Sequence, residues 1–142
     1  MKQMAFEKVL TANDTGESGS HQAGIHIPKT NQELVEFLPA LDPNVRNPDS
    51  WLTLKDPQGR EWKIRYIYYN NSLHDKQGTR DEYRLTHIRG FLREHGALKG
   101  DALRLSKDET GSYLASVIKS VAQNEEPGAP KRIKLSGWRR VH

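Results

Sequence analysis

The sequence predicts a mainly β (α+β) domain whose sheet is closed or nearly closed, with two short helices. Residues 61–69 alternate apolar and polar side chains, which is the pattern of a strand with one buried face. Several other short β-like runs are separated by turn-forming residues, and only two segments have helical spacing. Because short strands need their edges paired or covered, a sheet that closes on itself is the economical arrangement.

The run at residues 61–69 is the clearest strand. Its apolar residues at even positions, from Trp62 to Tyr68, share one face, while Lys63 and Arg65 share the other. Residues 51–55 precede it across the sequence DPQG, and a stretch with Pro and Gly between two β-like runs predicts a hairpin. Five more strands complete a set of about seven, at residues 6–11, 23–27, 102–106, 113–119 and 132–138.

Two segments, residues 31–38 and 86–95, carry apolar residues at the spacing of a helix with one buried face. Thr30 or Asn31 can cap the first of them. The residues that form these two apolar faces are Leu34, Phe37, Leu38, Ile88, Phe91 and Leu92.

Composition fits a single domain that covers residues 1–142, because a chain of this length is long enough for one core. A net charge of +4 and an isoelectric point of about 9.4 suit an anionic partner without demanding one. The absence of cysteine excludes disulfides, thiolate catalysis and Cys-based zinc sites, and it fits a reducing cytoplasm. No segment resembles a signal peptide or a membrane span, so we expect a soluble protein without a membrane partner.

A polar segment punctuated by glycine, residues 11–22, lies between two expected strands and can project as a loop. Gly16 and Gly19 allow close backbone approach, and polar side chains elsewhere in the segment can contact base edges or phosphates. An ordinary solvated loop with local turns is the alternative interpretation. The candidate contact residues are Asn13, Ser18, Ser20, His21 and Gln22.

A second polar segment, residues 70–84, leaves directly from the clearest strand. Arginine can bind O6 and N7 of guanine together, and a carboxylate can accept from N4 of cytosine, so this segment has the chemistry to read G·C pairs. Binding to phosphates alone has no use for carboxylates. Local ion pairing on a solvated turn is the alternative interpretation. The charged candidates are Arg80, Asp81, Glu82 and Arg84.

A third pattern points to a different class of protein. Pro48 and Asp49, followed by Glu61 and Lys63, resemble the PD…ExK arrangement of Mg²⁺-dependent nucleases, in which two carboxylates and a lysine surround a metal-bound water. The match is short and permissive, and Lys63 can simply face solvent. A self-sufficient nuclease therefore stays open as an alternative hypothesis.

No other pattern indicates catalysis. The six histidines show no metal-ligand spacing, and no Ser, His and Asp set is marked by a nucleophile motif, so we expect no catalytic or metal-binding residue. The basic stretch at residues 131–140 is either a phosphate-facing strand or a solubilising one.

Two blocks of the sequence resemble one known family. Residues 10–28, LTANDTGESGSHQAGIHIP, are similar to the opening loop of the N-terminal effector-binding domain of the EcoRII restriction endonuclease family. Residues 67–72 and 78–86 are similar to the second DNA-contacting loop of the same domain, in the same order. Two blocks in one order indicate membership of that family.

The resemblance implies a DNA-binding pseudobarrel, related to plant transcription-factor domains, whose two loops grip the major groove as arms. It implies a target like CCWGG, whose G·C-rich half-sites suit the Arg and Glu content of the second segment. It places His21 and Gln22 on the first arm, and Arg80, Glu82, Tyr83 and Arg84 on the second. Together with the residue chemistry, it gives the predicted DNA contacts Asn13, Ser18, Ser20, His21, Gln22, His26, Lys76, Arg80, Asp81, Glu82, Tyr83 and Arg84.

The resemblance also implies a larger parent protein. The chain is expected to be the monomeric DNA-recognition domain of a type IIE restriction endonuclease in the bacterial cytoplasm, and not itself an enzyme. Its partners are then double-stranded DNA and a catalytic nuclease domain in the same polypeptide. The nuclease would use Mg²⁺, whereas this domain needs no cofactor. A transcription-factor-like DNA-binding module is the remaining alternative.

Overall fold

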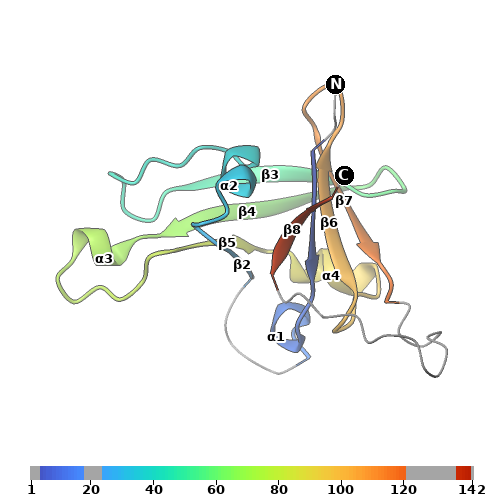
Figure 1. Cartoon of the computed structure of the whole chain (residues 1–142), viewed down its shortest axis with the longest axis horizontal. Coiled ribbons are helices and arrows are strands. Elements are labelled where there is room, and N and C mark those ends of the chain that lie inside the picture. The colour runs from blue at the N-terminus through green and yellow to red at the C-terminus, as the bar shows by residue number, and fades with distance from the viewer. Residues whose placement is uncertain (1–3, 18–23, 121–136, 142) are drawn as a thin grey trace.

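Eight strands form one sheet in the computed structural model, which describes residues 4–17, 24–120 and 137–141 (Figure 1). Their order in the sheet is β2-β5-β4-β3-β7-β6-β1-β8, and every neighbouring pair is antiparallel except β3 and β7. The predicted mainly β class is confirmed. The strands are β1 (Ala5–Val9), β2 (Ile25–Ile27), β3 (Asp49–Lys55), β4 (Glu61–Tyr69), β5 (Glu82–Thr86), β6 (Ala102–Lys107), β7 (Tyr113–Ile118) and β8 (Trp138–Val141).

The sheet nearly closes on itself. Its two edge strands are β2 and β8, and the indole nitrogen of Trp138 in β8 donates a hydrogen bond of 3.0 Å to the carbonyl of His26 in β2. A side chain therefore bridges the seam where ladder hydrogen bonds would close a full barrel. This arrangement is the nearly closed architecture that the sequence predicts.

Within the described ranges four short helices accompany the sheet: α1 (Ala12–Thr15), α2 (Gln32–Phe37), α3 (Asn71–His74) and α4 (Arg89–Glu94). The two predicted helices are α2 and α4, and Asn31 caps α2 by accepting from the amide of Leu34 at 3.2 Å. The other two are single turns within the polar segments. Figure 1 shows α1 and α4 together at one end of the sheet, whereas α3 lies at the far tip of the connection from β4 to β5.

The core lies inside the curved sheet, between α2 and α4. All six residues of the predicted apolar helix faces are buried. The Phe37 ring packs against Phe6 at 5.1 Å and edge-on against Tyr113 at 5.4 Å, which joins α2 to β1 and β7. Other fully buried core residues are Leu10, Ile25, Ile27, Leu54, Ile64, Tyr66, Leu85, Leu103 and Leu105.

Two strands differ from the prediction. The segment predicted as one polar loop, residues 70–84, ends in β5, because Glu82–Thr86 pairs with β4 on one side and with β2 on the other. The last strand runs over Trp138–Val141 instead of residues 132–138, of which 132–136 lie outside the described part of the chain. None of the helices in the described ranges is long and apolar enough to span a membrane.

Candidate nucleic-acid interface

The connection from β4 to β5, residues 70–81, projects beyond the sheet (Figure 1), and we call it the second arm. Glu82, Tyr83 and Arg84, which the resemblance places on that arm, lie in β5. The two sides of the second arm are joined by a hydrogen bond of 3.0 Å from the amide of Ser72 to the carbonyl of Arg80. Gly78 lies against the other side so closely that a Cβ there would be 2.3 Å from the carbonyl oxygen of Asn71. The arm is therefore a compact turn of defined shape, which only glycine permits at position 78.

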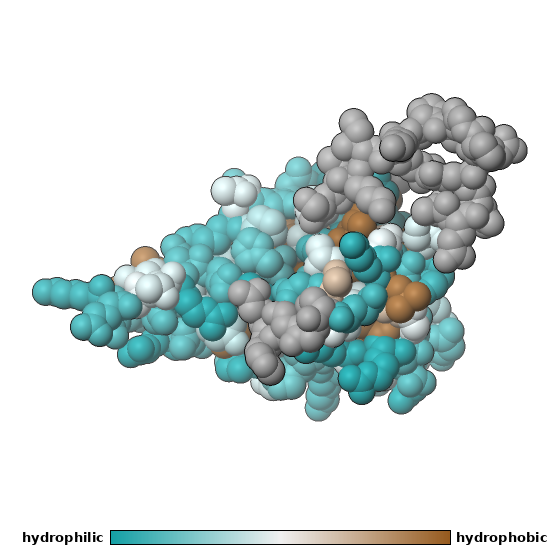
Figure 2. Space-filling view, turned by 90° about the horizontal axis from the view of Figure 1, so that it is seen from below, coloured by the Kyte–Doolittle hydropathy of each residue, from teal (hydrophilic) through white to brown (hydrophobic). Residues whose placement is uncertain are grey.

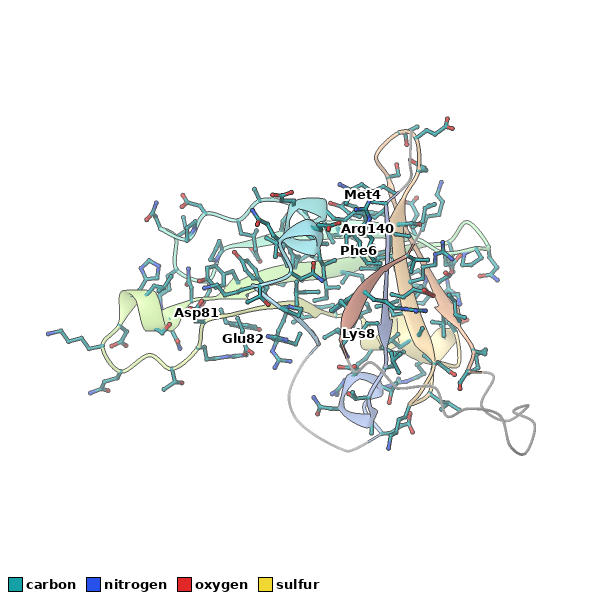
Figure 3. The ribbon with its side chains drawn as sticks, in the orientation of Figure 1. Met4, Phe6, Lys8, Asp81, Glu82 and Arg140 are labelled. Atoms are coloured by element: carbon teal, nitrogen blue, oxygen red, sulfur yellow. The ribbon has the colours of Figure 1, made fainter. Side chains whose placement is uncertain are left out.

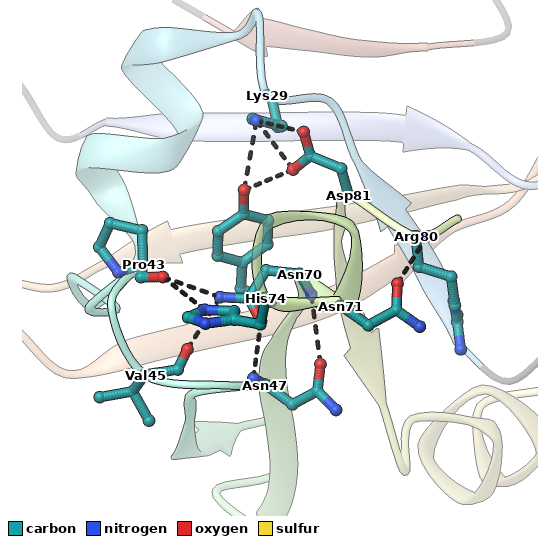
Figure 4. Close-up of polar contacts among 10 residues, drawn as sticks. Lys29, Pro43, Val45, Asn47, Asn70, Asn71, His74, Arg80 and Asp81 are labelled. Atoms are coloured by element: carbon teal, nitrogen blue, oxygen red, sulfur yellow. Dashed lines mark hydrogen bonds and ion pairs between the residues drawn. The ribbon is translucent and has the colours of Figure 1, made fainter. Parts of the chain in front are cut away.

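A buried asparagine fixes the base of the second arm (Figure 4). The Asn70 side-chain amide donates to the carbonyls of Pro43 (3.2 Å) and Val45 (2.8 Å), and its oxygen accepts from the amide of Asn47 at 2.8 Å. Asn47 returns the contact, because its side-chain oxygen accepts from the amide of Asn70. His74 adds a bond of 3.0 Å to Pro43. The sequence placed Asn70 in a polar segment but gave no sign of this role, since its partners lie about two dozen residues earlier.

Arg80, Glu82 and Arg84 form a row on one face of the chain as the second arm enters β5, which we call the outer row. The Arg80 guanidinium stacks over the Tyr69 ring at 3.7 Å and bonds the Glu82 carboxylate at 2.8 Å. Nη2 of Arg84 donates to the same carboxylate at 3.3 Å. Arg80 is 43% exposed, whereas Arg84 is largely buried. One carboxylate thus holds two guanidinium groups in place, and the more exposed one retains donors for a ligand.

The charge of Glu82 depends on these neighbours. Burial alone would raise the pKa of Glu82, but hydrogen bonds from Arg80 and Arg84 outweigh it and lower the pKa. The outer row therefore carries one negative and two positive charges at neutral pH. This combination offers both donors and acceptors to a base-pair edge.

Asp81 and Tyr83 alternate with the outer row along the chain, and the Asp81 side chain points toward Lys29, away from that of Arg80 (Figures 3 and 4). The Asp81 carboxylate accepts from Lys29 at 2.9 and 3.0 Å and from the Tyr68 hydroxyl. The Tyr68 and Lys29 hydrogen bonds lower the pKa of Asp81. The Tyr83 ring stacks on Tyr68 at 4.3 Å and on Tyr66 at 5.6 Å. Both predicted contact residues are thus engaged by side chains of the domain itself.

Two further predicted residues flank the outer row. His26 is exposed and lies directly opposite Arg84 in the β2–β5 ladder, so their side chains share one face of the sheet. Lys76 is exposed at the tip of the second arm. Figure 2 shows an almost wholly hydrophilic surface along this tapered end of the molecule.

The first arm, residues 11–22, is described up to residue 17. It begins with α1, where Thr11 and Asp14 form a capping box, and the buried Asp14 carboxylate pairs with Lys8 of β1. Gly16 ends the helix with φ of +88°, a left-handed conformation that favours glycine. The start of the first arm is therefore anchored to the sheet.

Asn13 is the one predicted first-arm contact in the described residues. It lies on α1, and its carbonyl accepts from the Arg89 guanidinium at 3.5 Å, which ties α1 to α4. The predicted contacts Ser18, Ser20, His21 and Gln22 lie outside the described residues.

The nuclease-like pattern is contradicted by strand register. In the β3–β4 hairpin Asp49 pairs with Ile67, whereas Glu61 pairs with Lys55. The two carboxylates therefore lie at opposite ends of the hairpin, about 20 Å apart at roughly 3.3 Å per residue. They cannot share one metal ion, whose oxygen ligands lie about 2.0–2.6 Å away. Asp49 instead pairs with Arg65 at 2.6 Å.

Comparison with known sequences finds relatives in two kinds of protein. Type II restriction enzyme EcoRII of Escherichia coli is 36% identical over 122 residues, which are 79% of this chain and 28% of that enzyme. Auxin response factor 16 of Arabidopsis thaliana is 27% identical over 117 residues, 82% of this chain and 15% of that protein. The chain thus spans less than a third of the length of either relative.

Comparison with solved structures identifies the fold. The Arabidopsis FUS3–DNA complex matches with a TM-score of 0.61 at 24% identity, covering 82% of this chain and 98% of that one. The B3 domain of the UbaLAI restriction endonuclease, solved with cognate DNA, matches with a TM-score of 0.56 at 22% identity, covering 99% and 89%. The fold is therefore the B3-type pseudobarrel, as the resemblance implied. Residues 1–119 match the family described as restriction endonuclease EcoRII, N-terminal, and the chain belongs to that family.

Proposed function

We propose that this chain binds double-stranded DNA in a sequence-specific manner, with the outer row entering the major groove. The observation that carries the proposal is the pair of guanidinium groups held by Glu82 at the root of a projecting arm. Support comes from membership of the EcoRII N-terminal family and from two solved relatives of the same fold that are complexes with DNA.

The chemistry of the outer row suits G·C pairs. Arg80 is exposed and oriented by Tyr69, so its planar group can donate two hydrogen bonds to O6 and N7 of guanine. Glu82 can accept from N4 of the paired cytosine once an arginine turns to the base. A site like CCWGG, with G·C pairs in both half-sites, is the target we propose. The residues of the first arm and the exposed Lys76 would then add contacts to bases and phosphates.

The biological role we propose is that of an effector or targeting domain. The chain covers 28% of EcoRII, so a catalytic nuclease domain that uses Mg²⁺ would lie elsewhere in the same polypeptide. DNA binding here would activate, tether or release that domain in a bacterial cytoplasm. The domain itself would bind as a monomer and leave DNA uncut.

The test is selection from a random duplex library, followed by competition between the selected duplex and a scrambled one at several salt concentrations. We expect CCWGG-like duplexes to be enriched, with a preference that persists as salt rises, because only phosphate-dominated binding ignores sequence.

The matched variants are Arg80→Lys and Arg60→Lys. Arg60 also stacks on an aromatic ring, Trp62 at 4.6 Å, and pairs with a carboxylate, Glu94 at 3.1 Å, but at the opposite end of β4. Lysine keeps the charge and loses the planar fork. Arg80→Lys should therefore weaken the binding free energy by about 1–3 kcal/mol for the selected duplex and by little for the scrambled one. Arg60→Lys should change neither binding free energy. Equal weakening on both duplexes would make Arg80 a phosphate contact and contradict base recognition by the outer row.

A further inference from the structure

We propose that Lys29, Tyr68 and Asp81 form a positioning set, which aims the outer row at DNA without touching a base. This inference rests on the proposed function and concerns how its specificity is built. In Figure 4 the Asp81 side chain points toward Lys29, whereas the side chain of the neighbouring Arg80 points away from them.

Asp81 is the link between the two faces, because it stands between Arg80 and Glu82 in the chain. Its carboxylate is held by two bonds from Lys29 and one from the Tyr68 hydroxyl. Asp81 immediately precedes β5, in which successive side chains point to opposite faces. Fixing Asp81 on one face therefore directs Arg80 and Glu82 to the other.

The groups that hold Asp81 are themselves anchored. Tyr68 is only 2% exposed, and its ring is stacked on Tyr83 within the β4–β5 pair. Lys29 comes two residues after β2, which follows the first arm in the chain. The Lys29 ammonium lies 5.4 Å from the centre of the Tyr68 ring. The set thus connects the strand that follows one arm to the base of the other.

The charges of Lys29 and Asp81 predict how DNA binding changes when the positioning set is disrupted. Lys29 is neutralised by Asp81, and the Asp81 hydrogen bond raises the pKa of Lys29, so both groups stay charged and paired at neutral pH. Removing the Asp81 charge would free the outer row to turn and would leave the Lys29 charge unpaired, which raises the net positive charge of the domain. Specific binding should fall while nonspecific binding holds or strengthens.

The experiment uses the full chain and the variants Lys29→Met, Tyr68→Phe, Asp81→Asn and the double variant Tyr68→Phe/Asp81→Asn. Affinity is measured for the duplex that wild type selects and for a scrambled one. Each single variant should lower the ratio of the two affinities by roughly three- to tenfold. The double variant should lower that ratio no further than Asp81→Asn alone does, because the side chains act as one unit. Glu109→Gln and Tyr113→Phe, which remove an exposed charge and a hydroxyl elsewhere, are controls that should leave the ratio unchanged.

A second measurement needs no DNA. The NMR order parameter of the Arg80 Nε–H bond should fall in Asp81→Asn and Tyr68→Phe while that of Arg60 stays constant. This measurement tests the positioning set even if the wild-type chain selects no DNA sequence. Failure to select a sequence would contradict the proposed function and not the positioning set.

Three results would overturn the inference. One is a loss of preference at a single base pair in Asp81→Asn, with Lys29→Met and Tyr68→Phe like wild type, because Asp81 would then contact that base. Another is equal weakening on both duplexes in Lys29→Met, which would make Lys29 a phosphate ligand. The third is an unchanged ratio and order parameter in every variant.

Discussion

Tyr66 is the largest side chain that the core encloses completely, and its hydroxyl has no hydrogen-bond partner among the described residues. Burial raises the pKa of Tyr66, so the hydroxyl stays protonated. A buried polar group without a partner lowers stability, because it loses its hydrogen bonds to water on folding. The ring itself stacks on Tyr83 and fills the core.

This feature gives a prediction at the residue scale. Tyr66→Phe should leave the free energy of unfolding unchanged or raise it by up to about 1 kcal/mol, measured by urea denaturation. Tyr113→Phe is the control: the Tyr113 hydroxyl donates to the Phe37 carbonyl at 2.8 Å, so its removal should cost about 1 kcal/mol. A clear loss of stability in Tyr66→Phe would mean that the hydroxyl has a partner in solution.

The chemistry of single residues was predictable, but the direction of their side chains was not. Arg80, Glu82 and Arg84 were candidates from residue type alone, and they form one row. Asp81 had the same chemistry, yet it lies on the opposite face and bonds Lys29. Which face of the chain each side chain takes depends on the register of β5. That register is set by pairing with β2 and β4, and it cannot be read from the local sequence.

Among the elements, the second arm is the one whose shape depends on a single small residue. Gly78 has an ordinary φ, so the need for glycine comes from the close approach of Asn71 alone. The arm contributes little to the core, since the residues at its tip are exposed. Its geometry can therefore be changed without unfolding the domain.

Gly78→Ala should lower affinity for the selected duplex by roughly tenfold or more while the urea midpoint moves little, because a misplaced contact residue loses its hydrogen bonds to the base. Gly59→Ala is the control: Gly59 has φ of +82° in the β3–β4 turn, but nothing lies within 4 Å of a Cβ there. It should cost stability through backbone strain and leave DNA binding unchanged. Wild-type affinity in Gly78→Ala would show that the arm tolerates rearrangement.

Hairpins and amphipathic helices were predictable at this scale, because their signals are local. Asp56-Pro57-Gln58-Gly59 forms the predicted turn, in which Asp56 accepts from the amides of Gln58 and Arg60. The strand β5 was missed because its polar residues follow a polar arm without a break in composition. Two neighbouring strands supply the pairing that composition does not reveal.

For the whole molecule, the seam between β2 and β8 depends on one side-chain bond, from Trp138 to the carbonyl of His26. The sequence predicted a closed or nearly closed sheet because short strands need covered edges. It could not predict that an indole completes the closure, because the two residues are more than a hundred positions apart.

Trp138→Phe keeps an aromatic ring in the seam and removes the donor. We expect a loss of about 1 kcal/mol in unfolding free energy and faster amide hydrogen exchange in β2. Tyr113→Phe again serves as the control, because it loses one bond of similar length without touching the seam. Unchanged exchange in β2 would mean that closure does not depend on the indole.

The order of strands in the sheet also has a consequence for synthesis. The strands next to both arms, β2 to β5, come from residues 25–86 and can pair as soon as that stretch leaves the ribosome. Strand β1 is made first, yet its neighbours β6 and β8 are made much later. A strand that stays unpaired during synthesis can pair with another chain and aggregate. Charged side chains within the strand oppose this aggregation. Glu7 and Lys8 are the charged residues of β1, and both are buried once β6 and β8 have paired with it.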